Sequence, residues 1–198
     1  MPHLRYSDFS MATRIEYYTR ALVLERTDAG ERDARLNLFT ERYGKIAARA
    51  RSLRAIRSKL SAHLQPFHFV RLRLTPRTSG NGFVVIDSVL DDAFVPSVTR
   101  RRFDCAGIVR VVDLYAPELD ADAVIWHALE ALFSDAPHEA SVERLAHVIL
   151  SRIGFDPRYA SCTGCGASAV THFVVGQGAF VCASCALSLP QNEVLYFV

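Results

Sequence analysis

Hydrophobic and basic residues alternate along two segments in the first half of the chain. In residues 45–51 the even positions are all apolar, and the odd positions hold three basic side chains and Ala47. Residues 68–74 show the same period, with two arginines between apolar neighbours. A period of two is typical of a strand that buries one face. We therefore expect two neighbouring strands whose basic side chains lie on one side of the molecule.

Three further segments are β-prone and bounded by turn residues, while apolar residues at spacings of three and four before Pro66 predict a short helix over 53–64. The five predicted strands cover residues 17–25, 34–40, 45–51, 68–74 and 83–89. Three strands, a helix and two more strands are the order of an OB-fold barrel, which commonly binds single-stranded nucleic acid. We predict this barrel over residues 17–95, preceded by a flexible tail over 1–16.

The period becomes helical after Pro96. Apolar stripes predict three helices, of which the first stops before Pro117, the second is capped by Asp120 or Asp122, and the third stops at Gly154. Cys105 and Trp126 fall on these stripes, where a core position is the ordinary role. The predicted fold class is therefore α+β, with a barrel followed by a small helical bundle over residues 96–198.

Four cysteines near the C-terminus follow the spacing of a metal site. Two C-x2-C pairs are separated by sixteen residues, and the β-prone segments 171–175 and 179–181 between them flank a turn with two glycines. Such a hairpin returns the second pair to the first, where four thiolates can bind one tetrahedral zinc at about 2.3 Å. We predict a structural zinc ribbon or knuckle over residues 158–187, with ligands Cys162, Cys165, Cys182 and Cys185.

Two other uses of these cysteines stay open. Two disulfides fit the same four residues. However, the sequence has no export signal and no apolar span long enough to cross a membrane. We therefore expect a cytoplasmic protein without membrane contact, a compartment in which disulfides are rare. A catalytic zinc is the second alternative. Four sulfur ligands leave no position for water, and the deaminase signature of H-x-E with P-C-x-x-C is absent from the sequence.

Charge is distributed unevenly along the chain. Residues 1–95 carry sixteen basic and ten acidic side chains, a net charge of +6. Residues 96–198 carry seven basic and eleven acidic side chains, a net charge of −4. The total net charge of +2 does not show this difference. Between Arg42 and Ile86 ten basic residues occur without one acidic residue. An unbroken run of one sign indicates a polyanionic partner, although a solubilising basic face would show the same composition.

These observations select candidate nucleic-acid-binding residues on the predicted strands and helix. Phosphate contacts need only positive charge along a face, so we expect little sequence preference. The candidates are Lys45, Arg49, Arg51, Arg54, Arg57, Lys59, Arg71 and Arg73. The sequence has no Walker A loop, no glycine-rich dinucleotide turn and no nucleophile elbow, and its seven histidines are scattered, so we expect no catalytic residues.

The order of barrel, helices and four-cysteine module resembles the RecO family of bacterial recombinational repair mediators. The resemblance covers about residues 17 to 187, and the family usually continues beyond the second cysteine pair and usually has glycine where this chain has Ser52. The matching segments are Ala21-Leu22-Val23-Leu24 with Gly30-Glu31, Leu38-Phe39-Thr40 with Gly44-Lys45, Ser58-Lys59-Leu60 through Leu64-Gln65-Pro66-Phe67, and Ile149-Leu150 with Ile153-Gly154-Phe155 running into Cys162-Thr163-Gly164-Cys165-Gly166.

This resemblance implies a non-enzymatic, nucleoid-associated mediator. Proteins of this kind bind single- and double-stranded DNA, anneal complementary strands, join RecR, contact the acidic tail of single-stranded DNA-binding protein, and help to load recombinase. We expect the tail to dock in the helical region, near Arg100, Arg101 and Arg102. An RNA-binding or transcription-associated module with the same two parts is the alternative, and a metalloenzyme is a weaker one.

Overall fold

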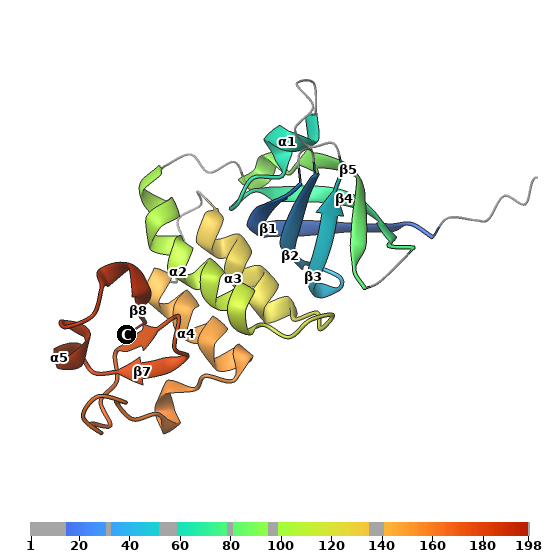
Figure 1. The fold of residues 1–198 in the computed structure, drawn as a ribbon. Coiled ribbons are helices and arrows are strands. Elements are labelled where there is room, and N and C mark those ends of the chain that lie inside the picture. The colour runs from blue at the N-terminus through green and yellow to red at the C-terminus, as the bar shows by residue number, and fades with distance from the viewer. Residues whose placement is uncertain are drawn as a thin grey trace, which may run out of the picture.

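The computed structural model describes residues 15–30, 33–51, 59–78, 81–94, 99–134 and 141–197, without the side chains of residues 59 and 99–104. Within these ranges the chain forms a closed β-barrel, a layer of helices and a small sheet, and the helices lie between the barrel and the sheet (Figure 1). None of the helices in the described ranges is long and apolar enough to cross a membrane.

The barrel has the strand order β1-β2-β3-β5-β4 and closes between β4 and β1. Strand β3 runs parallel to β5, and the other pairs are antiparallel. A short helix, α1, connects β3 to β4, which confirms the predicted OB-fold arrangement. The bounds are β1 (Tyr17–Ala29), β2 (Asp33–Thr40), β3 (Gly44–Ala50), α1 (Lys59–His63), β4 (Phe69–Pro76) and β5 (Phe83–Leu90).

The alternation predicted for the strands is present. In β3, Ile46, Ala48 and Ala50 are buried inside the barrel while the odd positions face outward, and β4 repeats this pattern. Strand β1 differs because residues 21–24 are buried on both faces. Ala21 and Val23 belong to the barrel core, whereas Leu22 and Leu24 pack in the cluster that includes the helices. Because β1 packs against both the barrel interior and the helices, residues 21–24 are all apolar.

The helical layer begins and ends where the capping residues predict. Asp122 is the N-cap of the second helix and accepts hydrogen bonds from the backbone N–H groups of Val124 and Ile125. Ser141 caps the third, which ends at Gly154 in the left-handed region at φ +105°. The bounds are α2 (Thr99–Tyr115), α3 (Ala123–Phe133) and α4 (Val142–Ile153), with short 3-10 turns η1 (Asp92–Phe94), η2 (Pro157–Tyr159) and η3 (Gln191–Glu193).

The C-terminal sheet extends further than predicted. The hairpin of β6 (His172–Val174) and β7 (Ala179–Val181) confirms the predicted pair, but β8 (Val194–Tyr196) adds a third strand beside β6. Helix α5 (Ala183–Ala186) connects the hairpin to this end of the chain. A boundary at residue 187 is therefore too early for this module, because the sheet needs β8 to cover β6.

The loop between α2 and α3 joins the helical layer to the barrel. The backbone N–H of Leu119 donates to the carbonyl of Lys45 at 2.9 Å, and Glu118 forms a parallel bridge with the same residue. Gly44, with φ +66°, lies so close that a Cβ there would overlap the backbone of Asp120. Only glycine permits both the turn and this approach, so one end of the β2–β3 face lies against the loop.

Candidate functional site

A hollow on the outer face of β2 and β3 collects three arginines. Arg35 comes from β2, Arg49 from β3, and Arg77 from the β4–β5 connection beside the start of β5. This face and this loop are where OB-fold barrels commonly bind oligonucleotides. We call the hollow the arginine groove, and its lining residues are Arg35, Leu36, Asn37, Ala47, Ala48, Arg49, Arg77, Asn81 and Phe83.

Two of the arginines lie directly opposite each other. Arg35 and Arg49 are cross-strand partners in the β2–β3 register, and like charges in this position destabilise a sheet. The Arg49 Nη2 atom contacts Asp33 Oδ2 at 2.9 Å, but Arg35 has no ion pair with any of the described residues. The Arg77 guanidinium reaches only the carbonyl of Asn81, at 3.5 Å. The groove therefore carries an excess of positive charge that a bound anion would offset.

Lys45, a predicted DNA contact, lies at the end of this face that meets the helices. Its Nζ atom donates to the carbonyl of Asp113 in α2 at 2.9 Å, and Asn37 Nδ2 donates to Asp113 Oδ1 at 2.8 Å. The structure thus uses Lys45 to join the barrel to α2. The helical layer limits the arginine groove at this end.

Arg71 and Arg73 face outward from β4, as the alternation predicts, but on another side of the barrel. The expectation that the two basic strands are neighbours is wrong, because β5 lies between β3 and β4 on one side and β1 and β2 lie between them on the other. The crossover through α1 places β4 beside β1, and β5 then returns parallel to β3. The predicted basic surface is therefore divided into two faces.

The remaining candidates are only partly described. Arg51 is exposed directly after β3. Arg54 and Arg57 lie outside the described residues, Lys59 begins α1 with its side chain outside the description, and the same holds for the side chains of Arg100, Arg101 and Arg102 in α2. Sequence reasoning did not select Arg35. The signal for it was present, since Arg35 lies between Ala34 and Leu36 in an alternating strand.

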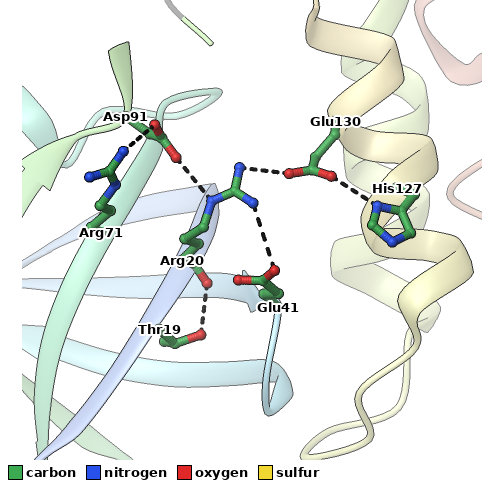
Figure 2. Close-up of polar contacts among 7 residues, drawn as sticks. All are labelled: Thr19, Arg20, Glu41, Arg71, Asp91, His127 and Glu130. Atoms are coloured by element: carbon green, nitrogen blue, oxygen red, sulfur yellow. Dashed lines mark hydrogen bonds and ion pairs between the residues drawn. The ribbon is translucent and has the colours of Figure 1, made fainter. Parts of the chain in front are cut away.

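Arg20 in β1 connects the barrel to α3 (Figure 2). Its Nε atom bonds to Asp91 Oδ2 at 3.0 Å, its Nη2 atom contacts Glu130 Oε1 at 2.6 Å, and its Nη1 atom lies 3.7 Å from Glu41 Oε1. The guanidinium carbon also lies 5.3 Å from the ring centre of Trp126. This arginine therefore has partners on both sides of the junction, and the sequence alone gave no sign of them.

Asp91 is the buried member of this group, with 4% of its side chain exposed. Burial acts to raise the pKa of its carboxyl, but hydrogen bonds from Arg20 and Arg71 outweigh burial and leave the pKa below its ordinary value. Arg71 Nη2 approaches the second carboxylate oxygen at 3.2 Å. Asp91 is thus held as an anion between two guanidinium groups.

The four predicted cysteine ligands meet at one point. Their sulfur atoms all lie within 4.8 Å of one another, and Cys165 Sγ is 3.7 Å from Cys182 Sγ, which is far longer than a disulfide bond of about 2.05 Å. A tetrahedral ion with sulfur ligands at about 2.3 Å places those sulfurs about 3.8 Å apart. The four side chains therefore fit one metal ion, whereas Cys105 is buried and lies apart from this cluster.

The environment of the cluster favours ionised sulfur at one ligand. Hydrogen bonds from the backbone of Cys182, and then of Cys165 and Gly164, lower the pKa of the Cys162 thiol to about 6. Hydrogen bonds with the other three sulfurs, that of Cys162 first, raise the pKa of Cys185 to about 12. Without a cation the cluster thus resists a second negative charge, and a bound cation removes this resistance.

Comparisons with known proteins agree with this architecture. Residues 11–89 match the family model described as Recombination protein O N terminal. Proteins named DNA repair protein RecO from Anaeromyxobacter sp. (strain K) and from Anaeromyxobacter dehalogenans (strain 2CP-1 / ATCC BAA-258) are each 30% identical to this chain over 195 residues. Each match covers 86% of this chain and 71% of the relative. These matches show that the chain belongs to the RecO family, whose members named here are DNA repair proteins.

Proposed function

We propose that this protein is a non-enzymatic mediator of recombinational repair that binds the sugar-phosphate backbone of DNA in the arginine groove. The observation that carries the proposal is the direct opposition of Arg35 and Arg49 across β2 and β3. A sheet retains such a like-charge pair at a cost in stability. A phosphate between the two guanidinium groups offsets that cost and accepts charge-assisted hydrogen bonds from both.

The lining of the groove favours phosphate contacts over base recognition. Besides its arginines it offers asparagine side chains and short apolar residues, and Phe83 is partly buried in contact with the Tyr17 ring. Contacts to phosphate position a nucleic acid without reading its sequence. We therefore expect both single and double strands to bind with little sequence preference. Arg51, and Arg54, Arg57 and Lys59 after it in the sequence, remain candidate contacts beyond the groove.

The finer functions follow the family. We propose that the protein anneals complementary strands, joins RecR, and helps to load recombinase on strands coated with single-stranded DNA-binding protein. Neutralisation of phosphate charge supports annealing, because it lowers the repulsion between two strands. We also propose that the metal in the cysteine cluster is one structural zinc, since four thiolates suit zinc and complete its tetrahedral coordination.

The acidic tail of single-stranded DNA-binding protein has a candidate site at the junction of β1 and α2. A hollow there combines an apolar floor with charged groups at its edge. It is lined by the apolar residues Leu24, Phe67, Ala106, Val109 and Leu114, by Arg110, and by the carboxylates of Glu25 and Asp113. The floor suits the apolar end of such a peptide, and Arg110 suits its carboxylates. Because Glu25 and Asp113 repel acidic residues, the acidic part of the tail must lie on the Arg110 side of the hollow. The α2 side of this hollow lies in the helical region expected from the sequence, whereas Leu24 and Phe67 belong to the barrel half of the chain. The side chains of Arg100, Arg101 and Arg102 lie outside the described residues.

The proposal is tested by removing the opposed arginines. In Arg35→Ala/Arg49→Ala, affinity for a single-stranded oligonucleotide should fall at least tenfold, and annealing of complementary strands should slow with it. Arg144→Ala/Arg158→Ala removes the same charge from exposed positions of the helical and cysteine-bearing half, and it should change neither measurement. If the two double variants had the same affinity for the oligonucleotide and the same annealing rate, the proposal would be contradicted. Strong RNA binding without any annealing of DNA would favour the RNA-binding alternative.

A further inference from the structure

A second hollow lies on the outer face of β1, β4 and β5. We propose that it is a separate site for single-stranded DNA, in which an unstacked base lies against Tyr18. This inference rests on the proposed function, because it assumes that DNA is the ligand of the barrel. The hollow is lined by Tyr18, Arg71, Leu72, Arg73, Asp87, Ser88 and Val89.

The register of the strands places aromatic, aliphatic and basic groups side by side. Tyr18 in β1 is the cross-strand partner of Arg73 in β4, and Val89 in β5 is the partner of Arg71. An exposed aromatic ring next to arginines is how many proteins bind single strands, because every base has a face that can stack. The hollow therefore offers one stacking surface with two cations beside it.

The apolar groups of this site are unusually open to solvent. Tyr18 is 58% exposed and Val89 is 56% exposed. The Tyr18 hydroxyl donates to Glu16 Oε2 at 3.0 Å, and Arg73 Nη1 lies 3.7 Å from the same carboxylate oxygen. These contacts hold the edge of the ring and leave much of its surface accessible. A flat, partly fixed apolar surface loses little conformational freedom when a base covers it.

Charge at this site is nearly balanced, in contrast to the arginine groove. Arg71 pairs with Asp91 and Arg73 lies near Glu16, while Asp87 is exposed in the same hollow. Attraction of phosphate is therefore weaker here, and binding must depend mainly on stacking. Stacking is available only from an unpaired base, so this site should discriminate single strands from duplex, and its affinity should depend little on salt.

The two sites lie on opposite sides of the closed barrel. The arginine groove lies over β2 and β3, whereas β4, the centre of the second hollow, is separated from them by β1 on one side and β5 on the other. One strand in each site would not overlap the other. A single chain can then hold two strands at once, an arrangement that favours annealing.

The test is the number of short thymidine oligonucleotides bound per chain, measured by native mass spectrometry at low salt. The wild-type protein should bind two, and Tyr18→Ala should bind one while keeping the steep salt dependence of the other. Tyr18→Phe keeps the ring and should bind two. Tyr159→Ala is the matched control, because Tyr159 is 85% exposed and its ring lies beside Arg158 on the cysteine-bearing half.

The outcomes separate this inference from the proposed function. If Tyr18→Ala binds as many strands as the wild-type protein while Arg35→Ala/Arg49→Ala loses one, the second site is refuted and the arginine groove stands. If the arginine variant binds as many oligonucleotides as the wild-type protein and Tyr18→Ala binds one fewer, DNA binding in the arginine groove is refuted and the stacking site is supported. If Tyr18→Ala lost as much affinity for duplex DNA as for single strands, the inference would also be overturned, since a duplex offers no unpaired base.

Discussion

At the scale of single residues, Arg20 shows how one side chain stabilises the junction between barrel and helices. Its side chain is 29% exposed, and its guanidinium contacts Asp91, directly after β5, and Glu130 from α3 (Figure 2). Phe94 and Trp126 cover it with their rings. Because Asp91 is buried, removal of Arg20 leaves a buried carboxylate with Arg71 as its remaining cation.

We expect Arg20→Met to lower the free energy of unfolding by about 2 kcal/mol at neutral pH. Loss of one partner from a buried pair costs about 3–5 kcal/mol, and partial exposure reduces that figure. For a chain of this size the melting temperature should fall by about 4–8 °C. Arg144→Met, at an exposed position of α4, is the control and should have little effect.

The effect of Arg20→Met should depend on pH. The pKa of Asp91 is lowered in the folded protein, so the carboxylate contributes stability above its ordinary pKa of about 4 and loses this contribution as pH falls through the folded value. The difference in melting temperature between wild type and variant should therefore be constant near neutral pH and should decrease below about pH 4. A difference that persists unchanged at pH 3 would show that packing of Arg20, and not its charge, stabilises the junction.

Residue patterns predicted the orientation of side chains better than their partners. Alternation correctly placed Arg49 and Arg73 on outer faces, since orientation within a strand depends only on its period. The opposition of Arg35 and Arg49 depends on the register of two strands, and the contacts of Arg20 depend on the docking of a helix. The local period of a sequence determines neither the register of two strands nor the docking of a helix. These contacts of Arg35, Arg49 and Arg20 could therefore be found only in the structure.

At the scale of elements, the cysteine module is completed by the last strand of the chain. Sheet order β7-β6-β8 places β6 in the centre, and Phe173 of β6 is fully buried beside Leu195 of β8 in the shared core. The hairpin was predictable from its two glycines and its C-x2-C pairs. The apolar run that contains β8 was not recognised, because a strand of three residues is too short to establish a period.

We expect the protein to contain one zinc per chain, and its removal to unfold the three-stranded sheet. So small a sheet depends on the metal, and structural zinc supplies about 10–16 kcal/mol of apparent binding free energy in peptides. Hydrogen exchange after chelation should increase in β6, β7 and β8, while the barrel over residues 17–90 stays protected. Elemental analysis of Cys162→Ser/Cys165→Ser should show loss of zinc.

Cys105→Ala provides the control for the zinc measurement, because Cys105 is buried in α2 and its Sγ lies 3.7 Å from the carbonyl of Leu132. Its zinc content should equal that of the wild-type protein. Freshly prepared wild-type protein with substantially less than one zinc, or a sheet that stays protected after complete removal of the metal, would contradict the structural role of the cluster.

At the scale of the whole molecule, the helical layer determines which part of the barrel surface is available to DNA. Residues of α2 and the following loop contact Lys45 and Asn37 and cover one end of the β2–β3 face. The arginine groove at the other end stays open. Composition predicted a basic barrel and an acidic second half, but only the closed strand order showed that the basic surface has two separate faces.

The central claim is that phosphate binds in the arginine groove, and the salt dependence of affinity tests it most directly. Each phosphate contact on a single strand contributes about 0.7 to the slope of log affinity against log salt. In Arg35→Ala/Arg49→Ala/Arg77→Ala the slope should therefore decrease by about 2, and by the same amount on unrelated sequences. In Arg110→Ala/Arg144→Ala/Arg158→Ala, which removes the same charge elsewhere, the slope should not change. An unchanged slope in the groove variant, in a folded protein with its metal, would contradict the account.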